Sequence, residues 1–328
     1  MQKQNFFSRV PISILAWTAL IINTVVILQG AIVRVTGSGA GCGRHWPSCQ
    51  GEIIPLNPRI DTMIEFSHRS LSLMVILLAI WIVVRVAQTR KINRGLFIFG
   101  SLSLVHIVIE ALLGASTVLF ELTGETVSTA RGVMVATHMV NSLWLVGMLT
   151  LTVVYATAKK PLWPLKMSKQ GPLATILIVS VVSMLVLMFT GGIAAMGNTM
   201  FPTESLAQGL RADFDPNSNI LIRLRLLHPL IAISIGIYLF ISLGLSRWIK
   251  PVEEASRFAR ALFSIYFIEL VIGTFNMVLL APAVVQVIHL AFAVLSFALL
   301  MALSVYTLAA PKTNVNELGH LGKVQSEI

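Results

Sequence analysis

Four of the seven histidines lie near one end of a long apolar segment, where an ionisable side chain is costly and therefore points to a function. Each is about six to eight residues from one end of its segment, or roughly 10 Å deep at the helical rise per residue. Paired imidazoles between the helices of a bundle are the usual means of holding a haem iron. The sequence therefore predicts two ligand pairs, His68 with His138 and His228 with His289, although hydrogen bonding to a neighbouring helix would explain any one histidine alone.

A carboxylate, Glu65, lies three residues before His68, and this spacing puts both side chains on one face of a helix. The second pair has no such acid, because Arg225 stands three residues before His228. An acid near a helix N-terminus is also favoured by the helix dipole, which gives Glu65 a purely structural alternative. A carboxylate one turn before an iron ligand is nevertheless well placed to act on a molecule bound to that iron. We predict Glu65 as the catalytic residue.

A haem carries two propionates, which need cationic partners at the edge of an apolar bundle. Arg34, Arg131 and Arg225 lie at the ends of apolar segments that are nearest to the histidines. Arg225 also shares a helix face with His228, three residues further along. We predict these three arginines as propionate ligands, and the alternative for each is an interfacial side chain that snorkels to water.

The composition determines what kind of element positions these residues. The chain of 328 residues is 56% hydrophobic and 12% charged, whereas a soluble domain has about 25% charged residues. Runs long enough to cross a bilayer, roughly 20 apolar residues each, cover about 12–33, 67–85, 95–119, 133–157, 172–195, 220–245, 259–280 and 283–308. We therefore expect an all-α integral membrane protein with eight transmembrane helices.

The formal charge of +10 is distributed unevenly along the chain. Lysines and arginines gather in the connections after the second, fourth and sixth apolar runs, and the positive-inside rule places these connections and both termini in the cytoplasm. The excess of basic residues thus indicates the topology in the membrane, and we expect no nucleic-acid partner. The connection after the first run, which holds Cys42 and Cys49 among several glycines, then faces the exported side.

The second half of the chain repeats features of the first. The spacing from histidine to glutamate is 42 residues in one half and 41 in the other, counted from His68 to Glu110 and from His228 to Glu269. An even number of helices separates the halves, so both have the same orientation in the membrane. We expect two pseudo-symmetric four-helix bundles, formed by residues 1–160 and 161–328, with Glu65 in the first half only.

The stretch around the first loop resembles the haem A synthase family of membrane proteins, in the bacterial form with a cysteine pair in the first external loop. The residues that carry this resemblance are Gly30 to Arg34, Thr36 to Gly39, Cys42 to Cys49 and Glu65 to Arg69. The second external loop lacks the cysteine pair that some members have there. The resemblance implies oxidation of the C8 methyl of haem O to a formyl group by successive hydroxylations, with Glu65 as the catalytic carboxylate.

The resemblance also implies how the two sites are divided. His68 and His138 would hold the substrate haem O, and His228 and His289 would hold a haem b cofactor. Cys42 and Cys49 face an oxidising compartment, so we expect a disulfide with a structural or redox role, with two free thiols as the alternative. We expect a multi-pass protein of the cell membrane whose partners are haem O, the lipid bilayer, haem O synthase and an electron acceptor, and a homo-oligomer is compatible with this picture.

Two other functions use the same histidines. An electron-transfer cytochrome that oxidises quinol would hold two b haems permanently and would not need Glu65. A haem carrier would need one exchangeable site and no redox cofactor. The asymmetry between the halves favours one retained and one converted haem, and therefore the enzyme.

Overall fold

The chain is built from long helices that run alongside one another. The computed structural model describes residues 10–88, 90–158, 162 and 170–309, and in this part of the chain there is no β-strand. Eight helical segments within it are long and apolar enough to cross a membrane, which confirms the expected fold class. They are α2 (Ile12–Val35), α3 (Ile60–Ala87), α4 (Arg94–Leu119), α5 (Thr129–Thr157), α6 (Pro172–Met200), α8 with α9 (Ile220–Arg225 and Leu227–Ile249), α10 (Glu253–Val278) and α11 (Ala283–Ala309).

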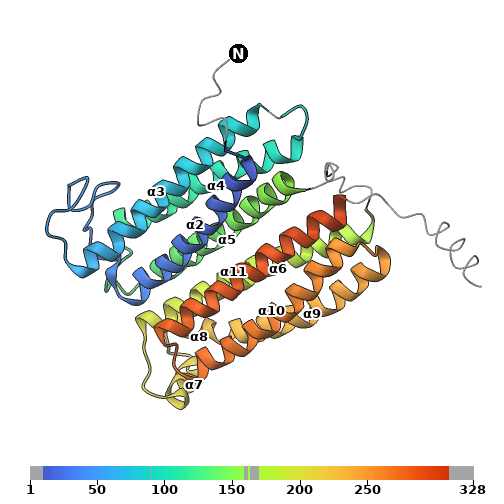
Figure 1. Cartoon of the computed structure of the whole chain (residues 1–328). Helices are drawn as coiled ribbons and strands as arrows, with labels where there is room; N and C mark the ends of the chain where they lie inside the picture. Colours follow the sequence, from blue (N-terminus) through green and yellow to red (C-terminus); the bar gives the residue numbers. More distant parts are fainter. Residues whose placement is uncertain (1–9, 89, 159–161, 163–169, 310–328) are drawn as a thin grey trace, which may run out of the picture.

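The helices pack as two rings of four. In the first ring α2 contacts α3 and α5, and α4 contacts α3 and α5; in the second, α6 contacts α9 and α11, and α10 contacts α9 and α11. Figure 1 shows the rings as a blue-to-green group beside a yellow-to-red group. Helix α5 is the most buried helix because it also contacts α6 and α11 of the second ring. The expected boundary at residues 160 and 161, like both chain termini, lies outside the described residues.

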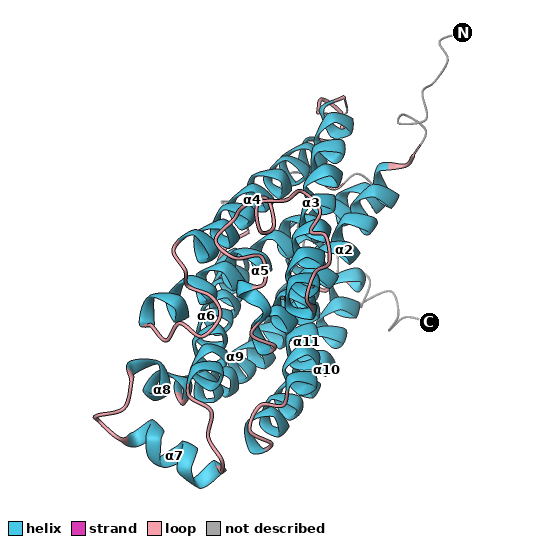
Figure 2. Cartoon of the chain, turned by 90° about the vertical axis from the view of Figure 1, so that its left-hand side faces the viewer, coloured by secondary structure: helices cyan, strands magenta, loops and turns pink. Residues whose placement is uncertain are grey.

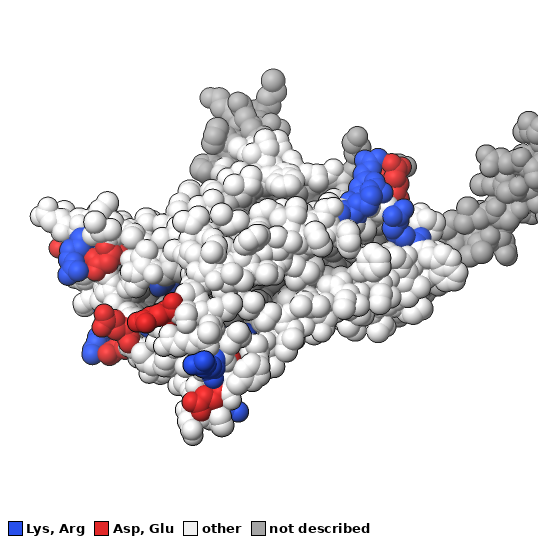
Figure 3. All heavy atoms as spheres, turned by 90° about the horizontal axis from the view of Figure 1, so that it is seen from below, with Lys and Arg blue, Asp and Glu red and all other residues white. Residues whose placement is uncertain are grey.

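Two long connecting segments lie at the same end of the bundle. The loop between α2 and α3 contains the short 3-10 helix η1 (Ser38–Ala40), and the amphipathic helix α7 (Leu206–Phe214) precedes α8. These segments lie at the same end of the two rings, here called the loop end (Figures 1 and 2). Charged side chains appear at the two ends of the molecule, with an uncharged band between them (Figure 3). This distribution is typical of a protein that spans a bilayer.

Several helices extend beyond the expected spans, and two of the differences, at the start of α3 and within the sixth span, have a clear local reason. Helix α3 begins at Ile60 rather than near residue 67, because Thr62 is buried and bonded to Gly41 of the preceding loop and Asp61 suits the helix N-terminus. The sixth span is interrupted after Arg225. Pro229 explains the break, since proline lacks a backbone N–H and its ring clashes with the carbonyl four residues earlier, which is that of Arg225.

The two rings meet through a close contact between α5 and α6. A Cβ added at Gly192 would lie 2.7 Å from the Cα of Ala136, too close for any backbone atom. Gly192→Ala should therefore force the helices apart and cost about 1–3 kcal/mol, as overpacking generally does. Gly244→Ala in α9 is the matched control because nothing lies within 4 Å of its added Cβ, so it should gain helix stability. Thermal unfolding in detergent checks this: Gly192→Ala should lower Tm and Gly244→Ala should not, and equal Tm values would contradict the contact.

Candidate haem-binding site

A cavity of about 1380 Å³ runs between the helices of both rings. This volume exceeds the roughly 300–1,000 Å³ of an ordinary small-molecule site, so the cavity has room for ligands of haem size. The catalytic candidate, both histidine pairs and all three arginines predicted from the sequence line it: Glu65, His68, His138, His228, His289, Arg34, Arg131 and Arg225. The fold thus brings every one of these predicted residues to a common space.

Each of the four histidine rings packs against a glycine of the preceding membrane helix. A Cβ at these glycines would lie between 2.9 and 3.6 Å from the ring carbon Cε1. The pairs are Gly30 with His68, Gly114 with His138, Gly191 with His228 and Gly273 with His289. The absence of a side chain on each glycine therefore lets the ring lie close to the neighbouring backbone. Sequence reasoning missed this contact, although Gly114 and Gly273 each stand four residues after a glutamate of the repeat, Glu110 and Glu269.

The Nδ1 atoms of three histidines face polar groups of the same preceding helices. Glu110 Oε1 lies 3.5 Å from Nδ1 of His138, and Glu269 Oε1 lies 3.3 Å from Nδ1 of His289. Thr190 Oγ1 lies 3.2 Å from Nδ1 of His228. When Nδ1 faces a partner of this kind, Nε2 is the nitrogen left to bind a metal. Glu110 and Glu269 are thus placed to orient His138 and His289.

The second histidine pair has the separation that a single iron requires. The ring centres of His228 and His289 are 6.3 Å apart, and the ring planes are 81° to each other. If an iron took one nitrogen from each ring at about 2 Å, with each ring centre about 1 Å beyond its nitrogen, the centres would be about 6 Å apart. The residues present therefore fit a haem with two axial histidines. His68 and His138 line the same cavity on the side of the first ring.

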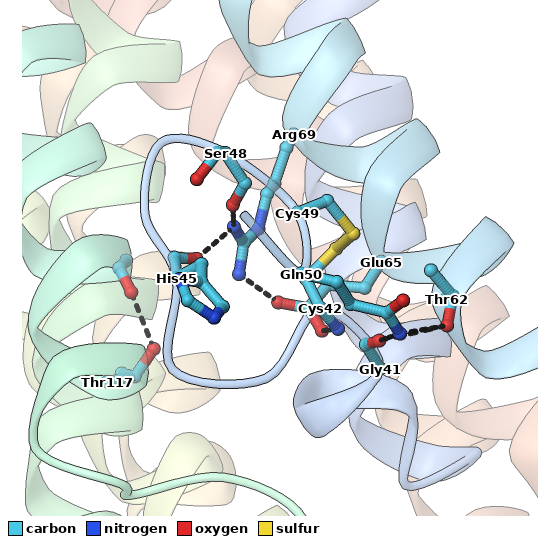
Figure 4. A network of polar contacts seen from close by, with 11 residues as sticks. Gly41, Cys42, His45, Ser48, Cys49, Gln50, Thr62, Glu65, Arg69 and Thr117 are labelled. Atoms are coloured by element: carbon cyan, nitrogen blue, oxygen red, sulfur yellow. Dashed lines mark hydrogen bonds and ion pairs between the residues drawn. A yellow bond between two sulfur atoms is a disulfide. The ribbon is translucent and has the colours of Figure 1, made fainter. Parts of the chain in front are cut away.

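Glu65 is held in a fixed position by the loop above it. Its side chain is buried, and Oε2 accepts a hydrogen bond of 2.8 Å from the backbone N–H of Cys42. Oε1 accepts from the guanidinium of Arg69, which also donates to the carbonyls of His45 at 2.7 Å and Ser48 at 2.8 Å (Figure 4). Arg69 therefore fastens the loop to α3 and does not simply extend to the membrane surface.

The loop itself is closed by a disulfide and seated on α3. Cys42 and Cys49 are joined, with Cα atoms 4.4 Å apart, which confirms the expected disulfide. Gly41 touches the start of α3 so closely that a Cβ would lie 2.6 Å from the backbone of Asp61, and its carbonyl accepts a hydrogen bond of 2.9 Å from Thr62 Oγ1. Close approach, and not a left-handed turn, is thus what requires glycine at position 41, where φ is −63°.

Arg34 and Arg131 are cations without an acidic partner among the described residues. Arg34 crosses to the second ring, where it donates to Thr199 Oγ1 at 2.6 Å and Gln286 Oε1 at 2.7 Å. Arg131 is buried and donates to the carbonyl of Thr126 at 2.8 Å. Two guanidinium groups that line a cavity and lack a carboxylate partner are suited to an anionic ligand group.

Arg225 differs from the other two arginines because it already has a carboxylate. It forms an ion pair with Asp213 of α7 and donates to Asn198 Oδ1 at 3.1 Å and to the carbonyl of Gly209 at 3.0 Å. These bonds attach α7 to the main bundle. The sequence could not reveal this role, because nothing in it shows that Asp213, twelve residues earlier in the chain, folds back onto Arg225.

A further polar cluster, formed by His106, Glu110 and Asn141, lies between α4 and α5. His106 and Glu110 are four residues apart on α4, a spacing that predicts a bond between them within the helix, and this expectation is wrong. Nδ1 of His106 lies 2.8 Å from Oδ1 of Asn141, and Asn141 in turn donates to Glu110 Oε2 at 2.6 Å. Asn141 on α5 thus satisfies both groups across the helix interface.

The fold and the site together define a polytopic helical membrane protein with a large cavity that is lined by two pairs of histidines. The family model of COX15-CtaA, described as cytochrome oxidase assembly protein, matches residues 13–301. The chain therefore belongs to the COX15-CtaA family.

The chain is also similar in sequence to several curated proteins, over part of their length. The chain is 36% identical over 310 residues to the protoheme IX farnesyltransferase of Thermus thermophilus, an alignment that covers 93% of this chain and 50% of the relative. It is 45% identical over 100 residues to the heme A synthase of Alkalihalophilus pseudofirmus, and 44% identical over 100 residues to that of Halalkalibacterium halodurans, covering 29% of this chain and 32% of each relative. The chain thus spans about half the length of the first relatives it matches and about a third of the others.

The disulfide gives the first prediction for the site. The chain has two cysteines in all, and both are in the bridge. Alkylation of the denatured, unreduced protein should therefore label no thiol, and alkylation after reduction should label two, as counted by mass spectrometry. Two labelled thiols without reduction would show that the bridge is absent.

Proposed function

We propose that this chain is a haem A synthase, which oxidises the C8 methyl of haem O to a formyl group by two successive hydroxylations and loss of water. The observation that carries the proposal is the buried carboxylate of Glu65, held at the cavity beside His68 by the disulfide loop. Neither an electron-transfer cytochrome nor a haem carrier needs such a group. Family membership and the relatives named heme A synthase support the same conclusion.

The two histidine pairs would serve different haems. We infer that His68 and His138 hold the substrate haem O, and that His228 and His289 hold a haem b cofactor. When bound, haem b would supply a one-electron redox centre close to the substrate. Arg34 and Arg131, which have no carboxylate partner among the described residues, would bind propionates. Arg225, already paired with Asp213, would do so only through its remaining N–H groups.

Glu65 would act on the proton released when a C–H bond of the methyl is broken. Help from a positioned base of this kind is typically worth about 10²–10⁴ in rate. Its two oxygens are fixed by Cys42 N–H and by Arg69, so little reorganisation is needed at the moment of reaction. The loop also covers the carboxylate, so the Glu65 side chain is buried.

The remaining parts of the proposal concern the internal repeat, the orientation in the membrane and the partner proteins. The four glycine and histidine contacts recur at matching positions, which supports two pseudo-symmetric halves that diverged in chemistry. The loop end would face the exported side of the cell membrane, with both termini in the cytoplasm. Haem O synthase would supply the substrate, and an electron acceptor would regenerate the cofactor.

The charge of Glu65 gives a direct test. Glu65→Gln keeps the shape but removes the base, so haem binding should persist while conversion falls by about 10²-fold or more. Asp61→Asn is the matched control, because it makes the same chemical change one turn earlier on α3 at a partly exposed side chain. Haem extracted from cells that carry each variant as the sole copy should contain haem O and no haem A for Glu65→Gln, and haem A for Asp61→Asn. Normal haem A with Glu65→Gln would remove this residue from the mechanism.

The cofactor assignment has its own test. His228→Ala or His289→Ala should abolish the low-spin haem b spectrum of the purified protein, because each removes one of two axial ligands. His106→Ala is the control, since this histidine bonds Asn141 and is not among the residues that line the cavity. An undiminished haem b spectrum in either of the first two variants would contradict the assignment.

A further inference from the structure

Asn23 is a buried residue whose amide nitrogen is left without a hydrogen-bond partner. Its side chain is 2% exposed, and Nδ2 finds no hydrogen-bond partner among the residues that the structure describes. A buried amide without a hydrogen bond costs free energy of folding. Asn23 also lines the cavity, so a ligand in the cavity can satisfy the amide.

The position of Asn23 on α2 shows which ligand it would meet. Asn23, Val26, Gly30 and Arg34 follow a spacing of three or four residues, which places them on one helix face, and all four line the cavity. The ring of His68 packs on Gly30. Arg34 is about one turn from Gly30 toward the loop end, and Asn23 is about two turns from it in the opposite direction. Along the axis of α2, the ring of His68 thus lies between the guanidinium of Arg34 and the amide of Asn23.

A haem O molecule has its polar groups in the same order. Its propionates lie on one edge of the ring, and on the opposite side the prenyl substituent carries a hydroxyl on the carbon attached to the ring. An iron bound by His68, with the propionates toward Arg34, would direct this hydroxyl toward Asn23. A hydroxyl both donates and accepts hydrogen bonds, and an asparagine amide does the same, so the two groups are complementary.

The second half of the chain offers a contrast at the same position. Gly191 packs on His228 as Gly30 packs on His68, and seven residues before Gly191 stands Met184, which is also buried and also lines the cavity. A methionine offers no comparable hydrogen bond and suits an apolar substituent. Haem b carries a vinyl group where haem O carries the hydroxylated prenyl chain. Asn23 therefore suits the hydroxylated chain of haem O, and Met184 suits the vinyl group of haem b.

We propose that Asn23 is a specificity-determining residue, which recognises the hydroxyl beside the ring of the substrate haem. The inference rests on the proposed function, because it takes the His68 side of the cavity to be the substrate site. A site built to hydrogen-bond a hydroxyl discriminates against the analogue that lacks it, since the amide is then left unpaired. The apolar tail contributes affinity but does not separate the hydroxylated from the dehydrated side chain.

Two iron porphyrins that differ only in hydroxyl groups test this. Iron haematoporphyrin IX carries hydroxyethyl groups where iron mesoporphyrin IX carries ethyl groups, and each is titrated into purified protein that retains its own haem. The wild type should bind the hydroxylated probe about fivefold more tightly, the effect of roughly one hydrogen bond. Asn23→Met and Asn23→Leu should each bring the ratio of the two Kd values to about one.

Controls separate this inference from the function on which it rests. Thr24→Val removes a hydroxyl that bonds only its own helix, at Leu20 O, and should keep the preference. His68→Ala should weaken both probes equally. Equal binding of the two probes by the wild type, or an unchanged preference in the Asn23 variants, would overturn the role of Asn23 alone. If His68→Ala bound both probes as tightly as the wild type, the substrate site itself would be wrong and the inference would fall with it.

Discussion

The hydrogen bond from the backbone of Cys42 to the carboxylate of Glu65 is the interaction on which the rest of the site depends. It joins the disulfide loop to the helix that carries His68. The loop can reach Glu65 only because Gly41 lies against the backbone of α3 and because Arg69 holds two loop carbonyls. A short loop closed by a disulfide thus becomes the cover of the cavity and the support of its carboxylate.

We infer that the two halves use similar packing for different chemistry. In both, a glycine on one helix receives a histidine ring from the next, and a glutamate lies near Nδ1 of the second histidine. The surrounding positions differ. Asn23 corresponds to Met184 and Arg34 to Ala195 when Gly30 and Gly191, which contact the histidines, are aligned, and Glu65 corresponds to Arg225 when His68 and His228 are aligned. A retained cofactor needs stable ligation, whereas a substrate must be recognised, oriented and released, and the polar positions lie on the side that we assign to the substrate.

Much of this architecture could be predicted from the sequence because it depends on local properties. The eight spans follow from apolar length, and the histidine pairs follow from the rarity of ionisable groups in such segments. Glu65 could be chosen because it shares a helix face with His68. The disulfide followed from the side of the membrane on which the loop was placed.

Other features depend on contacts between segments that are distant in sequence. No periodic pattern reveals that Arg34 reaches Thr199 or that Arg225 pairs with Asp213. The early start of α3 depends on the loop that packs over its first turn. Asn23 looked like an ordinary polar residue in an apolar run, and only the fold shows that its amide faces the cavity without a partner.

The most direct test of this account is the identity of the haems in the purified protein, determined by extraction and mass spectrometry after expression together with a source of haem O. The account predicts haem b together with haem O or its hydroxylated or formyl forms, one haem for each histidine pair. Two equivalents of haem b, with no haem O derivative in any preparation, would contradict it and would favour a di-haem electron-transfer cytochrome.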